Sequence, residues 1–130
     1  MKITEASILV VDDEPDLVEI FTAWLEDAHC KKVMGAENGK AALAKFESMC
    51  VDLLVTDINM PVMDGITLIR AIAKADLSMP IIIFVSGQTY NETELRQLGV
   101  RTFLPNPVRR TKFLAAIEDA LAIRLEQRFS

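Results

Sequence analysis

The sequence is short of cysteine and has no long apolar run. Its two cysteines are too few for a disulfide framework and lack the spacing of metal ligands, so we expect two free thiols. The longest apolar run is about six residues, well below the roughly 18 that a membrane-spanning helix needs. The first residues, MKITEAS, contain no apolar stretch typical of a signal peptide. We therefore expect a cytoplasmic protein that does not enter a membrane.

Basic residues are outnumbered by acidic ones. The chain has 14 lysines and arginines against 19 aspartates and glutamates, which gives a formal net charge of −5. Direct binding to nucleic acid needs a basic patch, so this balance argues against it. At 51% hydrophobic and 25% charged residues the composition is typical of a globular chain, and 130 residues suit a single domain.

Apolar runs alternate five times with helical patterns. The expected strands are residues 7–12, 32–36, 52–57, 80–86 and 100–105. Helical segments follow these strands. Their residues expected to face the core include Leu17, Ile20, Phe21, Trp24, Leu25, Ile66, Ile69, Ile72, Ala73, Leu114, Ile117, Leu121 and Leu125. Continuous apolar strands are covered on both faces, which indicates a parallel sheet between helices. Five such units are too few for an eight-stranded barrel, so we predict an open, doubly wound α/β sheet.

Polar residues end most of these strands. The first strand ends in Asp12 and Asp13, the third in Asp57, the fourth in Ser86 and the fifth in Asn106. Ligands of open α/β sheets bind at the carboxyl ends of the strands, so these side chains are expected to converge. Adjacent carboxylates repel each other, and a hard divalent cation would compensate them. Magnesium fits best, because it binds through one or two carboxylates, retained waters and a phosphate oxygen.

Each of these residues also has a purely structural interpretation. Asp13 could cap the following helix, Asp57 could cap a turn, and Ser86 stands before a glycine in an ordinary turn pair. Asn106 lies between two prolines and could serve turn chemistry alone. His29, the only histidine, is expected to be a solvated loop residue. The convergence of several strand ends is what favours the functional interpretation.

Four segments together resemble a known family. ILVVDDEPDL, DLLVTDINMPVMDG, PIIIFVSG and FLPNPV, in this order and spacing, resemble the receiver domain of two-component response regulators. The resemblance covers residues 6–125 and implies a five-stranded sheet in the order 2-1-3-4-5, a flavodoxin-like three-layer sandwich. Residues 1–130 would then be one receiver domain, with 126–130 a tail or the start of a linker.

The resemblance implies a role for each acid. Asp57 would accept a phosphoryl group from a histidine kinase or phosphotransfer protein, forming an aspartyl phosphate. Asp13 and Asp57 would bind Mg²⁺ directly, the Asn59 carbonyl would complete the set, and Asp12 would contribute mainly through water. Such a domain signals and is not an enzyme beyond its own phosphorylation and dephosphorylation.

The resemblance also implies how the signal leaves the site. Ser86 would bond a phosphoryl oxygen, and Phe103 would be the switch aromatic that turns inward. The readout face would be the fourth helix, fifth strand and fifth helix, about residues 90–122. A downstream protein, an output domain outside this sequence or a second copy of the chain in a homodimer would use that face.

One position departs from the family. Asn106 precedes Pro107 where the family has a lysine that pairs with the phosphoryl group. Without that lysine, three carboxylates and one Mg²⁺ leave a net negative charge before any phosphate arrives, unless Arg109 or Arg110 substitutes. An alternative function is therefore an atypical receiver that acts as a phosphorylation-independent interaction module. A flavodoxin-like cofactor binder or a phosphatase fits less well, because the acids after the first strand would repel a flavin phosphate and Asn59 stands where a phosphatase would carry a second acid.

Overall fold

The computed structural model describes residues 1–58, 63–75, 81–85, 91–105 and 107–129, without side chains at 81–85 and 123–129. Strands and α-helices alternate along these residues after a short 3₁₀ helix, η1, at Ile3–Glu5. The strands are β1 (Ser7–Val11), β2 (Lys32–Ala36), β3 (Leu53–Asp57), β4 (Ile81–Val85) and β5 (Val100–Pro105). The helices are α1 (Pro15–Asp27), α2 (Gly39–Ser48), α3 (Gly65–Lys74), α4 (Glu92–Gln97) and α5 (Arg110–Phe129).

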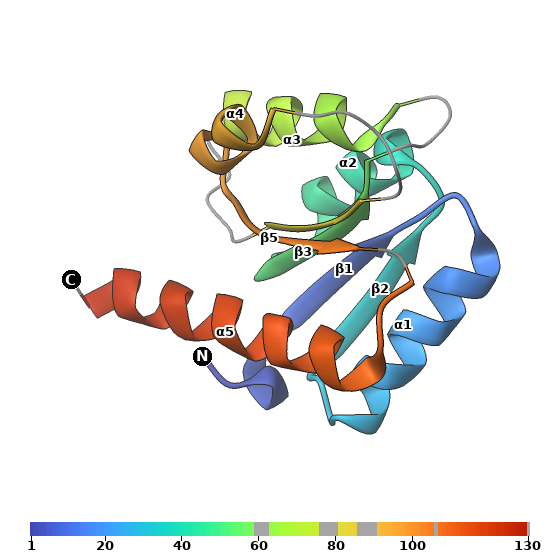
Figure 1. Ribbon diagram of the computed structural model, residues 1–130, viewed down its shortest axis with the longest axis vertical. Coiled ribbons are helices and arrows are strands. Elements are labelled where there is room, and N and C mark those ends of the chain that lie inside the picture. Colours follow the sequence, from blue (N-terminus) through green and yellow to red (C-terminus); the bar gives the residue numbers. More distant parts are fainter. Residues whose placement is uncertain (59–62, 76–80, 86–90, 106, 130) are drawn as a thin grey trace.

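All five strands lie in one parallel sheet in the order β2-β1-β3-β4-β5 (Figure 1). This confirms the predicted fold class and strand order. Because every strand is parallel to its neighbours, the carboxyl ends of β1 and β3 meet at the same edge of the sheet.

Two apolar layers explain why the strands read as continuous runs. Ile8 and Val10 of β1 pack on one face with α1 and α5, whereas Leu9 and Val11 pack on the other with α2, α3 and α4. Figure 1 shows α1 and α5 together on one side of the sheet and the other three helices opposite. Successive strand residues point to opposite faces, so a strand buried on both faces needs apolar residues at every position.

Two of the helix positions expected to face the core are exposed. Ile20 is 42% exposed, and Ala73 is exposed as well. Each lies beside the centre of its helix's buried stripe, which runs through Phe21 and Leu25 in α1 and through Leu68 and Ile72 in α3. One residue is about 100° of rotation around a helix, so a neighbour in sequence can leave the buried face.

The buried face of α5 is also shifted from the expected one. Ile117 and Leu121 are buried as predicted, and Leu114 is only partly buried. Phe113, which the sequence analysis did not place inward, is fully buried. The side chain of Leu125 lies outside the described residues.

An aromatic cluster fixes α5 against α1. The ring centroid of Phe113 lies 5.1 Å from that of Phe21 in a stacked arrangement and 5.6 Å from that of Trp24. Aromatic pairs at such separations stabilise beyond the area that they bury. This cluster therefore joins the two helices on that face of the sheet.

The chain turns sharply between α4 and β5. Gly99 has a φ of 114°, a backbone conformation that residues other than glycine rarely adopt. Gly99 lies two residues after Gln97, the last residue of α4, and its N–H donates to the Arg96 carbonyl at 3.2 Å. Among the described helices, none is long and apolar enough to cross a membrane, and both cysteines are free thiols.

Candidate functional site

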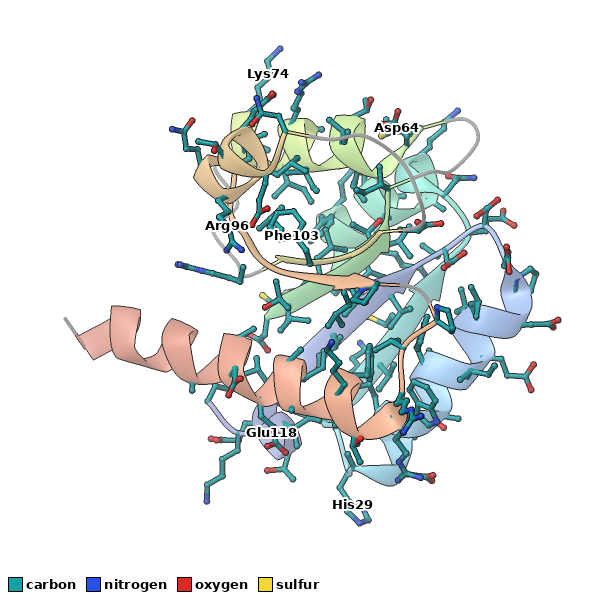
Figure 2. The ribbon with its side chains drawn as sticks, in the orientation of Figure 1. His29, Asp64, Lys74, Arg96, Phe103 and Glu118 are labelled. Carbon is teal, nitrogen blue, oxygen red and sulfur yellow. The ribbon has the colours of Figure 1, made fainter. Side chains whose placement is uncertain are left out.

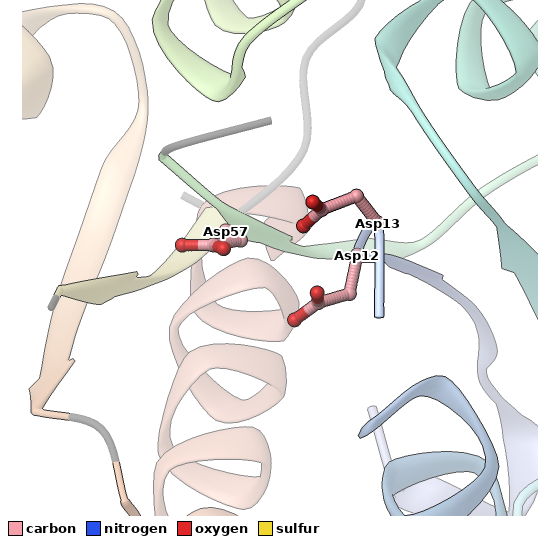
Figure 3. A group of neighbouring side chains, drawn as sticks. All are labelled: Asp12, Asp13 and Asp57. Atoms are coloured by element: carbon pink, nitrogen blue, oxygen red, sulfur yellow. The ribbon is translucent and has the colours of Figure 1, made fainter. Parts of the chain in front are cut away.

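Three carboxylates gather at the carboxyl edge of the sheet. Asp12 and Asp13 directly follow β1, and Asp57 is the last residue of the neighbouring strand β3. Val11 pairs with Thr56 in the β1–β3 register, which sets Asp12 level with Asp57. One carboxylate oxygen from each of the three acids lies within 4.8 Å of the others (Figure 3). The structure therefore brings together the three acids that the strand ends place at this edge.

Asp12 is the most buried of the three. It is 2% exposed, its backbone N–H donates to the Ala36 carbonyl at 3.1 Å, and its Oδ1 accepts the Glu14 N–H at 2.9 Å. The pKa of this carboxyl is raised from 3.8 to about 6, mainly by burial and in part by the charges of Asp57 and Asp13, while the Glu14 hydrogen bond acts in the lowering direction. A cation at this place would offset the repulsion between the Asp12 carboxylate and its acidic neighbours.

Asp13 does not cap the following helix. The residue before the first turn of α1 is Glu14, and it makes no side-chain capping hydrogen bond. The Asp13 side chain is exposed, and its carboxylate belongs to the group formed with Asp12 and Asp57. The capping interpretation of Asp13 is therefore wrong, and the acid is left with the cluster as its setting.

The backbone of Asp57 is fixed by a glycine that the sequence analysis did not single out. Asp57 is partly buried, and Thr56 Oγ1 donates to its carbonyl at 3.0 Å. Gly65, the first residue of α3, donates its N–H to the Ile58 carbonyl at 2.9 Å. A Cβ at Gly65 would overlap the Asp57 carbonyl oxygen and lie 2.9 Å from the Cα of Ile58. Only glycine lets α3 start this close to the end of β3, and its place at the end of the segment DLLVTDINMPVMDG is the signal that could have indicated it.

A hollow of about 470 Å³ borders the acids on the side of α1 and β2. Its lining residues are Asp12, Pro15, Val18, Glu19, Gly35, Ala36, Glu37 and Ala41. Among the described residues of this lining, the charged side chains are all acidic. The edge of the sheet therefore carries negative charge beyond the three clustered aspartates.

The remaining residues of the expected site are only partly described. Asn59, Ser86 and Asn106 lie outside the described residues, so their expected roles stay predictions. Phe103 lies on β5, where it pairs with Ile83, and is partly buried against the core layer of α2, α3 and α4. It is therefore two strands away from Asp57.

Two other polar residues lie away from the acids. His29 is exposed in the loop after α1, with a φ of 63° (Figure 2). Arg110, a possible substitute for the family's lysine, instead has Nη1 3.6 Å from Oδ2 of Asp27. Asp27 ends α1, about 18 Å along the helix axis from Pro15 beside the acids. His29 thus has the setting predicted for it, and Arg110 is engaged elsewhere.

The chain is similar to known proteins of one family. A family model described as the response regulator receiver domain matches residues 8–118. The chain belongs to this family. The receiver is 33% identical over 115 residues to the chemotaxis protein CheY of Bacillus subtilis (strain 168), a match that covers 88% of this chain and 96% of that protein. It is also similar to a solved response regulator receiver domain protein from Clostridium thermocellum, with 28% identity, a TM-score of 0.85 and coverage of 94% and 98% of the two chains.

Other relatives are much longer than this receiver. The transcriptional regulatory protein GlrR of Escherichia coli (strain K12) is 35% identical over 117 residues, which cover 89% of this chain and 26% of that protein. The receiver thus spans about a quarter of GlrR and of several other curated relatives that it matches. The family signals within two-component systems, and this membership supports the receiver prediction.

Proposed function

We propose that Asp57 accepts a phosphoryl group from a phosphohistidine on a histidine kinase or phosphotransfer protein. The observation that carries this proposal is the gathering of Asp57 with Asp12 and Asp13, within 4.8 Å at the carboxyl edge of a receiver-family sheet. A nucleophilic carboxylate beside two further carboxylates suits a reaction in which a cation and a phosphoryl group share one small space.

The transfer balances as a single displacement at phosphorus. A carboxylate oxygen of Asp57 attacks the phosphorus atom, forming an O–P bond as the N–P bond to the imidazole breaks. The electron pair of the N–P bond stays on the imidazole nitrogen, which leaves as neutral histidine after proton transfer. The product is an acyl phosphate on Asp57.

The donor set fits Mg²⁺. Asp13 and Asp57 would hold the ion directly, Asp12 would act mainly through water, and the Asn59 carbonyl would complete the ligands. Carboxylate and carbonyl oxygens together with retained waters are the ligands that Mg²⁺ prefers. The pKa of Asp12 is raised mainly by burial and in part by the neighbouring carboxylates, whose charge a cation would offset. When bound, Mg²⁺ supplies positive charge that offsets the charge on the phosphoryl oxygens.

Phosphorylation of Asp57 would change the structure at the α4–β5 edge of the sheet. We propose that Ser86 bonds a phosphoryl oxygen and that Phe103 changes orientation in response, so that modification biases a pre-existing equilibrium. The face of α4, β5 and α5 would then recruit a downstream protein, an output domain or a second copy of this chain.

A second candidate function rests on Asn106. Asparagine is neutral and shorter than the lysine of the family, and Arg110 is paired with Asp27. An acceptor site without that cation would hold the added phosphoryl charge less well. The chain could then act as an interaction module whose binding does not depend on phosphorylation.

Intact-mass measurement of the protein with Mg²⁺ and a small acyl phosphate tests the first function. We expect one phosphoryl adduct that disappears in Asp57→Asn and when Mg²⁺ is chelated. Glu37→Gln, which removes an acid at the rim outside the cluster, is the matched control and should keep the adduct. An adduct that persists in Asp57→Asn would contradict the assignment.

Asn106→Lys separates the two functions. If the wild-type chain and Asn106→Lys both take the adduct, Asp57 is a competent acceptor without lysine. If only Asn106→Lys takes it, the interaction module is the better description, and the missing lysine is its cause. The same intact-mass measurement on the two proteins gives either result.

A further inference from the structure

The Arg96 guanidinium joins α4 to β5. Its Nε and Nη2 both donate to Oε1 of Glu92, at 3.0 and 2.8 Å, one helical turn earlier in α4. Its Nη1 donates to the backbone carbonyl of Arg101 on β5 at 3.2 Å. Figure 2 shows Arg96 beside Phe103 at this edge of the sheet. One side chain thus contacts both the helix and the strand.

The carbonyl that Arg96 contacts belongs to an irregularity in β5. Ile81 pairs with Val100, but Ile82 pairs with Thr102, so Arg101 is an extra residue in the β4–β5 ladder. An extra residue of this kind leaves local groups unpaired and changes the direction of the strand beyond it. Arg96 therefore binds the backbone at the irregular point of β5, two residues before Phe103.

The same guanidinium lies over the Phe103 ring. Its Cζ is 4.9 Å from the ring centroid, within the range of cation–π attraction. Phe103 is only partly buried, so part of its ring is accessible to such a partner. The planar group uses its edges for Glu92 and Arg101 and one face for the ring.

We propose that Arg96 is a positioning residue that holds Phe103 in its present orientation. If the ring turned away, the guanidinium would lose its face contact, so Arg96 favours the orientation seen here. The link from this hold to signalling rests on the proposed function of Asp57, whereas the hold itself is a property of the unmodified protein. Arg96 would then set how readily phosphorylation changes the α4–β5 edge.

The expected size of the effect is modest. Arg96 is 52% exposed and Glu92 54% exposed, so solvent weakens their ion pair. Exposed cation–π contacts and ion pairs correspond to about a two- to fivefold change in an equilibrium constant. Such a change is too small to disrupt the fold and large enough to alter the ratio of two ring orientations.

Three variants separate the possible causes. Arg96→Lys keeps the charge but loses the planar fork, and Arg96→Met keeps most of the length without charge or donors. Arg101→Met is the matched control, because it removes the same charge from the same edge while its backbone carbonyl remains. The side chain of Arg101 is exposed.

Fluorine NMR of protein labelled with fluorophenylalanine measures the hold directly. The chain has six phenylalanines, and the Phe103 resonance is assigned by its loss in Phe103→Leu. In unmodified protein we expect both Arg96 variants to move the Phe103 resonance, or to shift the ratio of its two forms about two- to fivefold. The other five resonances should stay in place, which reports an intact fold, and Arg101→Met should leave Phe103 unchanged.

The role of Arg96 is tested separately from the proposed function of Asp57. An unchanged Phe103 resonance in both Arg96 variants would overturn the proposal, and so would an equal change in Arg101→Met. Adduct formation on Asp57 is measured separately by mass. A moved resonance without any adduct would support the hold and contradict the acceptor function, whereas an adduct with an unmoved resonance would do the reverse.

Discussion

The acid edge and the α4–β5 edge of the same sheet are held in different ways. The acids follow strands whose residues, such as Val10 and Leu54, have no exposed surface. At the other edge, Arg96 pairs with Glu92, and Arg70 of α3 pairs with Glu94 of α4 at 2.6 Å, with all four side chains at least 42% exposed. Buried apolar residues underlie both edges, with Leu95 of α4 and Val100 of β5 at the second, but the ion pairs of α4 are solvated.

The difference indicates which edge can change its structure. A fully buried aliphatic side chain stabilises by about 1.5–3 kcal/mol, whereas an exposed ion pair contributes roughly 0–1 kcal/mol. Chemistry that needs fixed carboxylates therefore sits where rearrangement is costly. A response to that chemistry is most easily made through the exposed ion pairs of α4, because each of them contributes little to stability.

Truncation of the core under the acid edge should have the largest effect. Leu54→Ala removes a fully buried side chain from β3, and we expect it to lower the free energy of unfolding by roughly 3 kcal/mol. Phe103→Ala removes a larger but partly buried side chain and should cost less than half as much. Urea unfolding measures both, and equal losses would remove the distinction between the two edges.

The pH dependence of stability should report Asp12. The folded-state pKa of about 6 lies above the ordinary 3.8, so the folded protein binds the extra proton between these values. Metal-free stability should therefore fall as pH rises from about 4 to about 6 and stay lower above that range, by up to roughly 3 kcal/mol. Asp12→Asn should flatten this dependence and stabilise the metal-free protein at pH 7.

Asp13→Asn is the control for that measurement. It removes the same formal charge from an exposed side chain, so its effect on metal-free stability should be smaller than that of Asp12→Asn. Added Mg²⁺ should stabilise the wild type, by about 2.7 kcal/mol at a concentration one hundred times its dissociation constant. A wild-type stability that rises between pH 4 and 6 would contradict the assignment to Asp12.

Gly65→Ala should disturb the acid edge from outside the cluster. The new methyl would overlap the Asp57 carbonyl oxygen, and we expect unfolding to become easier by about 1–3 kcal/mol with slower adduct formation on Asp57. Gly35→Ala is the matched control. Its methyl would meet one side-chain methyl of Val18 at 2.7 Å, without touching the site backbone. Adduct formation should be slower only in Gly65→Ala.

Loss of an ion pair at the other edge should have the smallest effect. Arg70→Ala breaks the pair with Glu94, and because both side chains are exposed we expect a change of about 0.5 kcal/mol or less. Urea unfolding at low and high salt checks this, since a screened pair should matter less at high salt. A loss as large as that of Leu54→Ala would show that this ion pair stabilises the protein as much as a buried side chain under the acid edge does.

The sheet and the acid cluster were accessible from the sequence because they depend on local signals. Uninterrupted apolar runs locate the strands to within about one residue, and parallel pairing then puts Asp12, Asp13 and Asp57 at one edge. Helix faces were less certain, because a stripe can shift by one position. That shift buries Phe113 and exposes Ile20.

The α4–β5 contacts could not be read from the sequence. The contact between Arg96 and Phe103 joins residues seven positions apart across a turn and depends on an extra residue in β5. The role of Gly65 depends on how closely α3 approaches the end of β3. Both are consequences of tertiary packing, which no periodic pattern encodes.

Hydrogen exchange with and without acyl phosphate and Mg²⁺ tests most directly whether chemistry at one edge is read at the other. The adduct on Asp57 is verified by mass in the same samples, with Asp57→Asn as the control. We expect exchange to change mainly in residues 92–105, while 53–57 stay protected. A protein that carries the adduct but shows the same exchange in 92–105 as the unmodified protein would contradict the link between the two edges.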